Sequence, residues 1–149
     1  FRSNEAQNGL ALLSKDAKAE ASSYVNEAEA PKFAVDGDLG TKWCATGSAP
    51  YVLTVDLGSL KTVSEIRMAH AAAGGESPSM NTRAYTLELS KDGTNFHEVS
   101  RTASNSDGNT INTFAAASAR FIRLTVNQPT QGADSAVRLY EFEAYGLTK

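Results

Sequence analysis

The sequence predicts an all-β fold, an antiparallel β-sandwich, on three observations. Apolar side chains recur at every second residue in several short segments, which is the period of a half-buried strand. Gly-, Ser- and Asn-rich turns separate these segments, as they do in sandwiches and barrels. No long helical pattern lies between them, which argues against a parallel α/β fold. The length of 149 residues suits a single domain.

The expected strands follow one another along the chain. Residues 10–20 fit either a helix or an edge strand, because helix formers there also alternate as Ala with Lys or Glu. Beyond them, alternation predicts strands over residues 51–57, 63–70, 85–90, 96–102, 121–126 and 137–145. Asp92-Gly93 is a turn signal that predicts a hairpin. The inward faces supply the expected core: Tyr51, Leu53, Val55, Leu57, Ile66, Met68, Tyr85, Leu87, Leu89, Ile122, Leu124 and Val126.

Composition excludes several classes of function. A net charge of −3 argues against nucleic-acid binding, which relies on Lys and Arg to neutralise phosphates. No apolar run reaches the roughly 20 residues of a membrane-spanning helix. Cys44 is the single cysteine, so no disulfide framework is expected. No nucleophile elbow, phosphate-binding loop or zinc-protease motif occurs, so we do not expect an enzyme. Because Phe1 is not a natural start, we interpret residues 1–8 as linker and residues 9–149 as one module of a longer protein.

Residues 33–43 are the most informative segment. Asp36, Gly37, Asp38, Gly40 and Thr41 fall within six residues, in a run that suits a tight loop with its oxygens turned inward. Calcium takes six to eight oxygen ligands, and backbone carbonyls serve as well as carboxylates. From spacing alone, a calcium loop and a solvated Asp-Gly-Asp turn are both open.

Two long loops and two histidines are the remaining candidates for binding. Residues 71–82 and 127–136 form loops longer than folding requires, and such loops on a rigid sandwich commonly carry binding. His70 ends a strand and opens the first of these loops, whereas His97 follows the hairpin turn as an exposed strand residue. By itself His70 is either a structural hydrogen-bonding residue or a functional one.

Taken together, these segments resemble the discoidin-like, coagulation-factor C-type domains, and among them the bacterial family 32 carbohydrate-binding modules. The resemblance covers residues 9–147. The residues that carry it are Leu10-Ala11, Ala21-Ser22-Ser23, Ala34-Val35-Asp36-Gly37-Asp38, Thr41-Lys42-Trp43, Val55-Asp56-Leu57-Gly58, Ser90-Lys91-Asp92-Gly93, Ala119-Arg120-Phe121-Ile122-Arg123-Leu124 and the closing run from Arg138 to Gly146.

The resemblance implies a jelly roll of a five-stranded and a three-stranded sheet, of the galactose-binding-domain type, with neighbouring termini. It also implies a structural calcium ion held by the side chains of Asp36, Thr41 and Glu141. Carbonyls of Phe33, Asp38 and Thr41 would complete the shell. The choice of Glu141 over Glu143 rests on the family motif, since both side chains point to the same face of their strand. Trp43 is expected to pack beneath this loop.

The sugar site is likewise implied by the resemblance. His70, Arg83 and Asn105 match the His, Arg and Asn with which galactose-binding relatives satisfy sugar hydroxyls. Protonation of His70 below about pH 6 would then weaken binding. No Trp or Phe stands clearly where a sugar ring would stack.

The expected function is that of a non-catalytic, calcium-containing, monomeric module. It would recognise terminal galactose, N-acetylgalactosamine or a related sugar and target an attached glycan-active enzyme. We expect the parent protein to be secreted or attached to the cell surface, and bacterial. The alternative is a cell-surface adhesion domain that binds protein or phospholipid, because eukaryotic relatives of the family do so.

Overall fold

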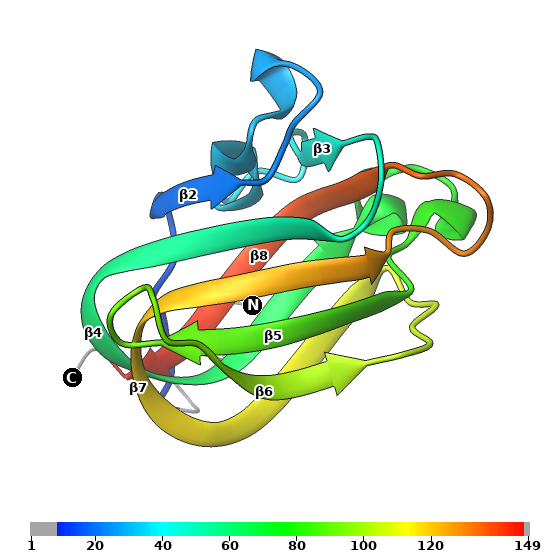
Figure 1. Ribbon diagram of the computed structural model, residues 1–149. Helices are drawn as coiled ribbons and strands as arrows, with labels where there is room; N and C mark the ends of the chain where they lie inside the picture. Colours follow the sequence, from blue (N-terminus) through cyan, green and yellow to red (C-terminus); the bar gives the residue numbers. More distant parts are fainter. Residues whose placement is uncertain (1–8, 148–149) are drawn as a thin grey trace.

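The computed structural model describes residues 9–147 and has an all-β architecture (Figure 1). The expected linker, residues 1–8, lies outside the described residues. The strands are β1 (Ala11–Leu12), β2 (Lys18–Ala21), β3 (Trp43–Ala45), β4 (Tyr51–His70), β5 (Ala84–Ser90), β6 (His97–Thr102), β7 (Asn109–Gln128) and β8 (Val137–Leu147). Short 3₁₀ turns join some of them: η1 (Glu27–Glu29), η2 (Pro31–Ala34), η3 (Ala71–Gly74) and η4 (Pro78–Met80). None of the helices described is long and apolar enough to cross a membrane.

Two long strands belong to both layers of the sandwich. The first half of β4 pairs with β2 and with the second half of β7, which continues to β5 and β6. The second half of β4 pairs with β8 and with the first half of β7. A register shift between Asp56 and Lys61, around Gly58 with φ 88°, is where β4 turns from one layer to the other. The predicted antiparallel sandwich of five and three main strands is therefore confirmed.

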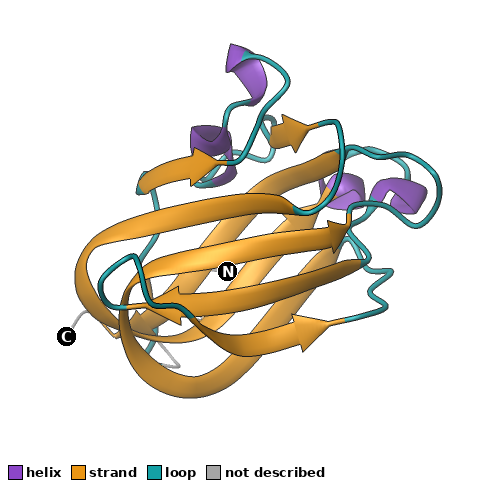
Figure 2. Cartoon of the chain, in the orientation of Figure 1, coloured by secondary structure: helices purple, strands orange, loops and turns teal. Residues whose placement is uncertain are grey.

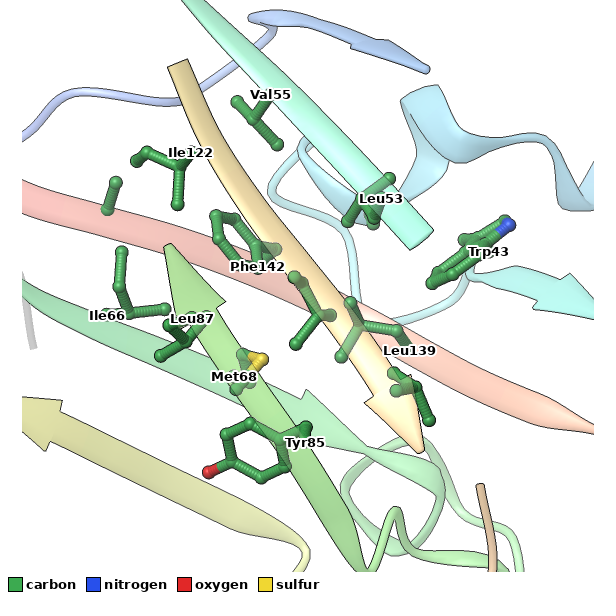
Figure 3. Packing of buried hydrophobic residues seen from close by; sticks show 14 of the residues in the cluster. Trp43, Leu53, Val55, Ile66, Met68, Tyr85, Leu87, Ile122, Leu139 and Phe142 are labelled. Carbon is green, nitrogen blue, oxygen red and sulfur yellow. The ribbon is translucent and has the colours of Figure 1, made fainter. Parts of the chain in front are cut away.

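The core lies between the two layers (Figure 3). Leu53 and Val55 of β4 and Ile122 of β7 project from the five-stranded layer. They meet Met68 of β4 and Phe142 of β8 from the other layer, and all are at most 2% exposed. The residues of the expected core are buried except Leu57, which is half-buried beside the bend at Gly58, and the period-two patterns are otherwise confirmed.

Two expectations about the elements are resolved or corrected. Residues 10–20 form no helix: β1 and β2 are short edge strands paired with β8 and β4, and a turn at Lys15-Asp16 separates them. The first half of β7 is a strand that alternation failed to predict, because its small and polar side chains alternate only between exposed and half-buried positions. The predicted hairpin is confirmed, since β5 and β6 pair around Asp92-Gly93.

One end of the sandwich gathers three loops, which we call the loop end: residues 71–82, 103–108 and 127–136. Both β4 and β7 double back on the left of Figure 1, so each begins and finishes at this end. The Gln131 side chain ties the loops together by donating to the carbonyls of Asn81 and Asn105, both at 2.9 Å. The described chain ends lie together elsewhere, where Ala11 pairs with Gly146. Figure 2 shows the short turns η3 and η4 at the loop end.

Candidate functional site

The Asp36 loop, residues 36–41, turns its oxygens toward one another. The Asp36 carboxylate accepts hydrogen bonds from the Thr41 hydroxyl at 2.5 Å and from the backbone N–H of Asp38 at 3.0 Å. The Thr41 hydroxyl also lies 3.1 Å from the Asp38 carbonyl oxygen. Gly37 makes the turn with φ 77°, a conformation that other residues adopt only with strain. The loop thus brings a carboxylate, a hydroxyl and a carbonyl oxygen to one point.

Glu141 of β8 is the strand carboxylate that contacts this loop. It is 6% exposed, and its Oε2 accepts from the Gly37 N–H at 2.7 Å. Burial, followed by the neighbouring Asp36, raises the pKa of Glu141 to about 9. Glu143, the alternative that the sequence left open, instead accepts from the Tyr145 hydroxyl at 2.9 Å. The geometry therefore favours Glu141 as the partner of Asp36.

The donor set fits a hard cation. Within residues 9–147 no group of three or more His, Cys, Asp or Glu could hold a metal ion, so an ion here would need hydroxyl and carbonyl oxygens besides two carboxylates. That mixture is what calcium accepts and zinc does not. Of the other expected ligands, Phe33 lies half-buried in η2, just before the loop. The Asp38 carboxylate accepts from the Gly40 N–H at 2.7 Å, which leaves its carbonyl as the contribution of Asp38.

His70, at the end of β4, is buried rather than presented to solvent. Its ring is 1% exposed, and Nε2 lies 3.0 Å from the Thr110 hydroxyl oxygen. Burial lowers the pKa of His70 to about 4, so the ring is neutral at pH 7. His70 is therefore expected to protonate at a lower pH than the pH 6 expected from the sequence, because desolvation disfavours its charged form. A ring so enclosed supports the loops beneath a ligand more readily than it reaches one.

Arg83 and Asn105 lie side by side at the loop end. The Asn105 N–H donates to the Arg83 carbonyl at 2.8 Å. The Asn105 side-chain amide is engaged within the protein, since it donates to Thr82 and Asp107 carbonyls at 2.9 and 3.0 Å. Arg83 is half-buried, and its guanidinium lies 3.4 Å from the Gln131 side-chain oxygen. The loop end thus gathers all three predicted residues, and Arg83 is the one with a partly exposed side chain.

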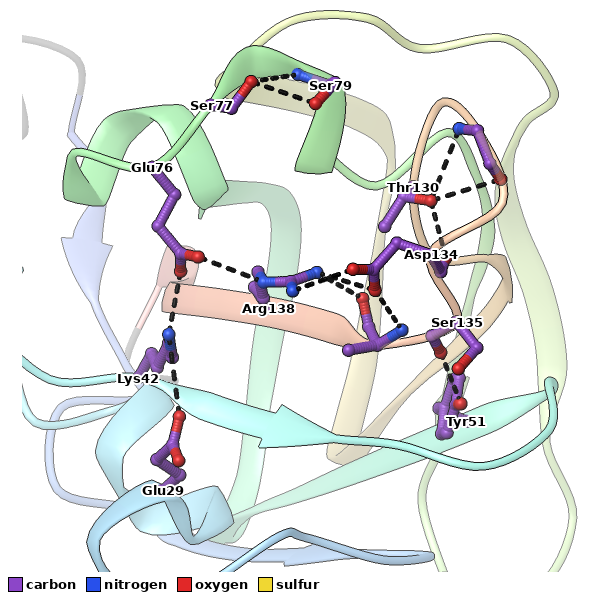
Figure 4. Close-up of polar contacts among 12 residues, drawn as sticks. Glu29, Lys42, Tyr51, Glu76, Ser77, Ser79, Thr130, Asp134, Ser135 and Arg138 are labelled. Atoms are coloured by element: carbon purple, nitrogen blue, oxygen red, sulfur yellow. Dashed lines mark hydrogen bonds and ion pairs between the residues drawn. The ribbon is translucent and has the colours of Figure 1, made fainter.

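A second set of polar side chains, which we call the Glu76 network, lies beside these loops (Figure 4). Glu76 Oε2 accepts from the Lys42 ammonium at 2.8 Å and from the Tyr140 hydroxyl at 2.6 Å. Its other oxygen pairs with Arg138 at 3.1 Å, and Arg138 in turn pairs with Asp134 at 3.2 Å. Lys42 also lies 3.6 Å from the Glu29 carboxylate, which belongs to η1. The members of the network are Glu29, Lys42, Glu76, Asp134, Arg138 and Tyr140.

The Glu76 network is mostly buried, yet it is charged at neutral pH. The exposed fractions of the Lys42, Glu76 and Arg138 side chains are 21%, 27% and 15%. Partial burial would raise the pKa of Glu76, but the hydrogen bonds from Lys42 and Tyr140 outweigh it and lower that pKa. Gly74 of η3 lies against the Tyr140 ring, where a Cβ would collide with it. Fixed, partly solvated hydrogen-bonding groups of this kind suit a small polar ligand.

Sequence reasoning missed the Glu76 network because its members are far apart in the chain. Residues 71–82 form a long loop, but nothing in the sequence of this loop pairs Glu76 with Lys42 or Arg138. Their proximity follows from β3 pairing with β8, which sets Trp43 opposite Leu139. The one available signal was Tyr140, a large side chain in a strand with apolar residues on both of its faces.

Comparison with known proteins identifies the family. The F5/8 type C domain family matches residues 18–141, so the chain belongs to this family. The fold and the recurring motifs described above are in accord with that assignment. A comparison with curated protein sequences gives no match.

Solved structures give the same architecture. Chitosan-binding module 1 of a chitosanase/glucanase from Paenibacillus sp. IK-5 is 29% identical, with a TM-score of 0.78 over 91% of this chain and 99% of that one. The family 32 carbohydrate-binding module of EndoD from Streptococcus pneumoniae is 22% identical, with a TM-score of 0.80 over 90% and 98%. The family 32 module of NanJ from Clostridium perfringens, solved with galactose, is 19% identical, with a TM-score of 0.78 over 92% and 99%. These structural neighbours are carbohydrate-binding modules.

Proposed function

We propose that this chain is a non-catalytic, calcium-containing carbohydrate-binding module. It recognises terminal galactose, N-acetylgalactosamine or a related sugar, and it holds an attached, secreted glycan-active enzyme on its substrate. The gain from such a module is one of effective concentration, because the tethered enzyme stays near the glycan that the module has bound. The galactose complex of NanJ and the origin of the Paenibacillus module in a chitosanase/glucanase support this proposal.

The observation that carries the proposal is the Glu76 network beside the loop end. A sugar presents hydroxyl groups that both donate and accept hydrogen bonds, so it needs fixed acceptors and donors within a few ångströms of one another. Glu76 in the 71–82 loop supplies acceptors, while Lys42, just before β3, and Arg138 of β8 supply donors. Arg83 at the neighbouring loops adds a further donor.

In this proposal His70 and Asn105 act by holding the loop end. Both side chains are at most 9% exposed. The Asn105 amide bridges the segments on either side of it, and the backbone N–H of His70 donates to the Gly108 carbonyl at 2.7 Å. Their contribution to sugar binding is therefore to position Arg83 and the loop backbones.

A second candidate ligand is an amine-bearing glycan such as chitosan. The Glu76 network contains three carboxylates, of Glu29, Glu76 and Asp134, against two cations, of Lys42 and Arg138. An excess of negative charge favours a cationic amino sugar over a neutral one. The Paenibacillus module, at 29% identity, is described as chitosan-binding.

The alternative of phospholipid adhesion has one observation in its favour. Tyr24 and Val25 are neighbouring apolar side chains that are 44% and 40% exposed. The residues that follow them, Glu27 and Glu29, are acidic and would be repelled by an anionic lipid surface. The charge of this region thus favours the glycan over the membrane.

Calorimetric titration of wild type and Glu76→Gln tests the proposal. The titrants are galactose, N-acetylgalactosamine, glucosamine and chitotriose. We expect wild type to bind at least one of them with a Kd of roughly 10 µM to 1 mM, because a shallow site desolvates little surface. Glu76→Gln should weaken that binding by about tenfold or more, since Lys42 and Arg138 lose the carboxylate that they share and keep only one amide oxygen as an acceptor.

Glu98→Gln is the matched control. Glu98 also pairs with an arginine, Arg101 at 2.7 Å, but stands on β6 away from the loop end. Its substitution should leave binding unchanged. Selective binding of glucosamine and chitotriose would favour the second candidate, whereas the absence of binding to any glycan would contradict the proposed function.

A further inference from the structure

A groove on the flank of the sandwich lies outside every site described so far. It has a volume of about 530 Å³, within the range of small-molecule sites. We call it the Tyr24 groove. It runs between β2 and the turns η1 and η2, which stand above the sheets in Figure 1. Its lining consists of Ala19, Glu20, Ala21, Tyr24, Glu27, Ala30, Pro31 and Lys32.

Tyr24 gives this groove an aromatic wall. The side chain is 44% exposed, although burial of an aromatic ring is normally favourable. Its hydroxyl donates to Glu27 Oε2 at 3.1 Å, and this bond orients both the ring and the carboxylate. An exposed aromatic face with a positioned acceptor beside it is suited to a ring that has C–H groups on one side and hydroxyls at its edge.

The rest of the lining leaves room for such a ring. Ala21, Ala30 and Pro31 are small and apolar, and the last two are buried. Glu20 and Lys32 are exposed charged residues at the groove, where they offer an acceptor and a donor to hydroxyl or amino groups. This combination of an apolar surface and a few polar groups is typical of a ligand site.

The η1 turn separates the Tyr24 groove from the Glu76 network. Glu27 faces Tyr24, while Glu29, two residues further on, lies 3.6 Å from Lys42 of the network. Asn26 donates to Glu29 at 3.0 Å and so fixes the turn between them. Since a 3₁₀ turn rises about 2 Å per residue, Glu27 and Glu29 lie only about 4 Å apart along the turn, so the groove and the network are neighbours across η1.

We propose that the Tyr24 groove is a second sugar subsite, which takes another ring of the oligosaccharide whose terminal ring binds at the Glu76 network. The inference rests on the proposed function and adds to it the class of ligand, an oligosaccharide rather than a single sugar. Tyr24 supplies the stacking face, and Glu27 and Glu20 accept hydrogen bonds from that second ring.

Titration of monosaccharides and oligosaccharides, monitored by calorimetry and by amide chemical shifts, tests this subsite. The probes are glucosamine with chitotriose, and galactose with N-acetylgalactosaminyl-β-1,3-galactose. We expect Tyr24→Ala to weaken binding of the favoured oligosaccharide by about five- to tenfold and to leave its monosaccharide unchanged. Tyr24→Phe keeps the ring face and should retain most of the affinity. Val25→Ala, a neighbouring exposed residue outside the groove lining, should have no effect.

Each other outcome is decisive. Unchanged oligosaccharide binding in Tyr24→Ala, together with its loss in Glu76→Gln, would overturn the second subsite and leave the proposed function standing. Equal losses for monosaccharide and oligosaccharide in Tyr24→Ala would assign Tyr24 to the primary site and overturn the proposal as well. Failure of the wild type to bind any probe would overturn both. Because Tyr24 is nearly half exposed, its truncation is compatible with folding, and the dispersion of the amide spectrum verifies this.

Discussion

At the scale of single residues, the buried ring of His70 links the stability of the fold to pH. Its ring packs against Tyr85, with 6.0 Å between centroids, and reaches the Thr110 hydroxyl. Neither neighbour carries a charge at neutral pH, so nothing in contact with the ring compensates a proton on it. The ring must therefore stay neutral for the loop end to keep its structure.

We predict a loss of stability in mild acid that depends on His70. The folded pKa of about 4 lies below the unfolded value of 6.5, so the unfolded state binds the proton more tightly. The stabilisation is complete above pH 6.5 and is lost as the pH falls from 6.5 toward 4. The free energy of unfolding of wild type should drop by about 2–3 kcal/mol from this group alone between pH 7 and 4.5.

Urea denaturation of wild type and His70→Gln at pH 7 and 4.5 measures this effect. Carboxylates that titrate in the same range affect both proteins, so the difference between the two pH dependences isolates His70. The substitution should lower stability at pH 7 and flatten the pH dependence. The same pH dependence of the free energy of unfolding in both proteins would show that protonation of His70 does not contribute to the loss of stability.

At the scale of elements, the Asp36 loop and β8 depend on each other. The loop supplies Asp36 and Thr41, and the strand supplies Glu141. Glu141 accepts a hydrogen bond from Gly37, which lies 104 residues earlier in the chain. Two facing carboxylates with little solvent are unfavourable unless a proton or a cation lies between them. A calcium ion would convert this repulsion into a bond between loop and strand.

We predict that calcium raises the melting temperature of the protein and that EDTA lowers it. An ion that binds only the folded state adds about 2.7 kcal/mol at one hundred times its Kd, which is roughly 5–10 °C for a domain of this size. Asp36→Ala should abolish most of this gain. Asp38→Asn should keep it, because Asp38 is expected to contribute its carbonyl and its side chain bonds only to Gly40 N–H. A melting temperature insensitive to EDTA would contradict the calcium site.

How far the sequence predicts these elements depends on which faces are buried. Alternation located the buried half of β4 around Leu53 and the buried half of β7 around Leu124, because each has one face in the core. It divided β4 into two strands, since the bend at Gly58 interrupts the pattern without ending the strand. The family motifs led to the Asp36 loop and to Glu141, whereas the Glu76 network arises from strand pairing that no local pattern encodes.

At the scale of the whole molecule, the doubling back of β4 and β7 separates the loop end from the described chain ends. Both strands begin and finish at the loop end, so three loops gather there on one rigid body. The described chain ends pair with each other through β1 and β8. In the proposed function, this arrangement would keep the loop end clear of an attached enzyme.

We predict that the protein has no hydrolytic activity of its own. Neither the motifs nor the described geometry provides a nucleophile with an activating base, and Glu76 is held by Lys42, Arg138 and Tyr140 rather than poised for proton transfer. Chromogenic glycosides and esters should remain uncleaved by the purified protein. Turnover that survives rigorous purification and disappears in a point mutant would contradict this.

The pairing of the chain ends also determines how the module responds to mechanical tension. A pull between residues 9 and 147 loads the two antiparallel pairs, Ala11 with Gly146 and Leu12 with Tyr145, one after the other rather than together. Beyond them the chain is fastened by Ser14, whose hydroxyl accepts from the Ala144 N–H at 2.9 Å, and by the Asp16 N–H, which donates to the Val35 carbonyl at 2.7 Å. Val35 immediately precedes Asp36, so a force strong enough to peel away this segment would next strain the Asp36 loop.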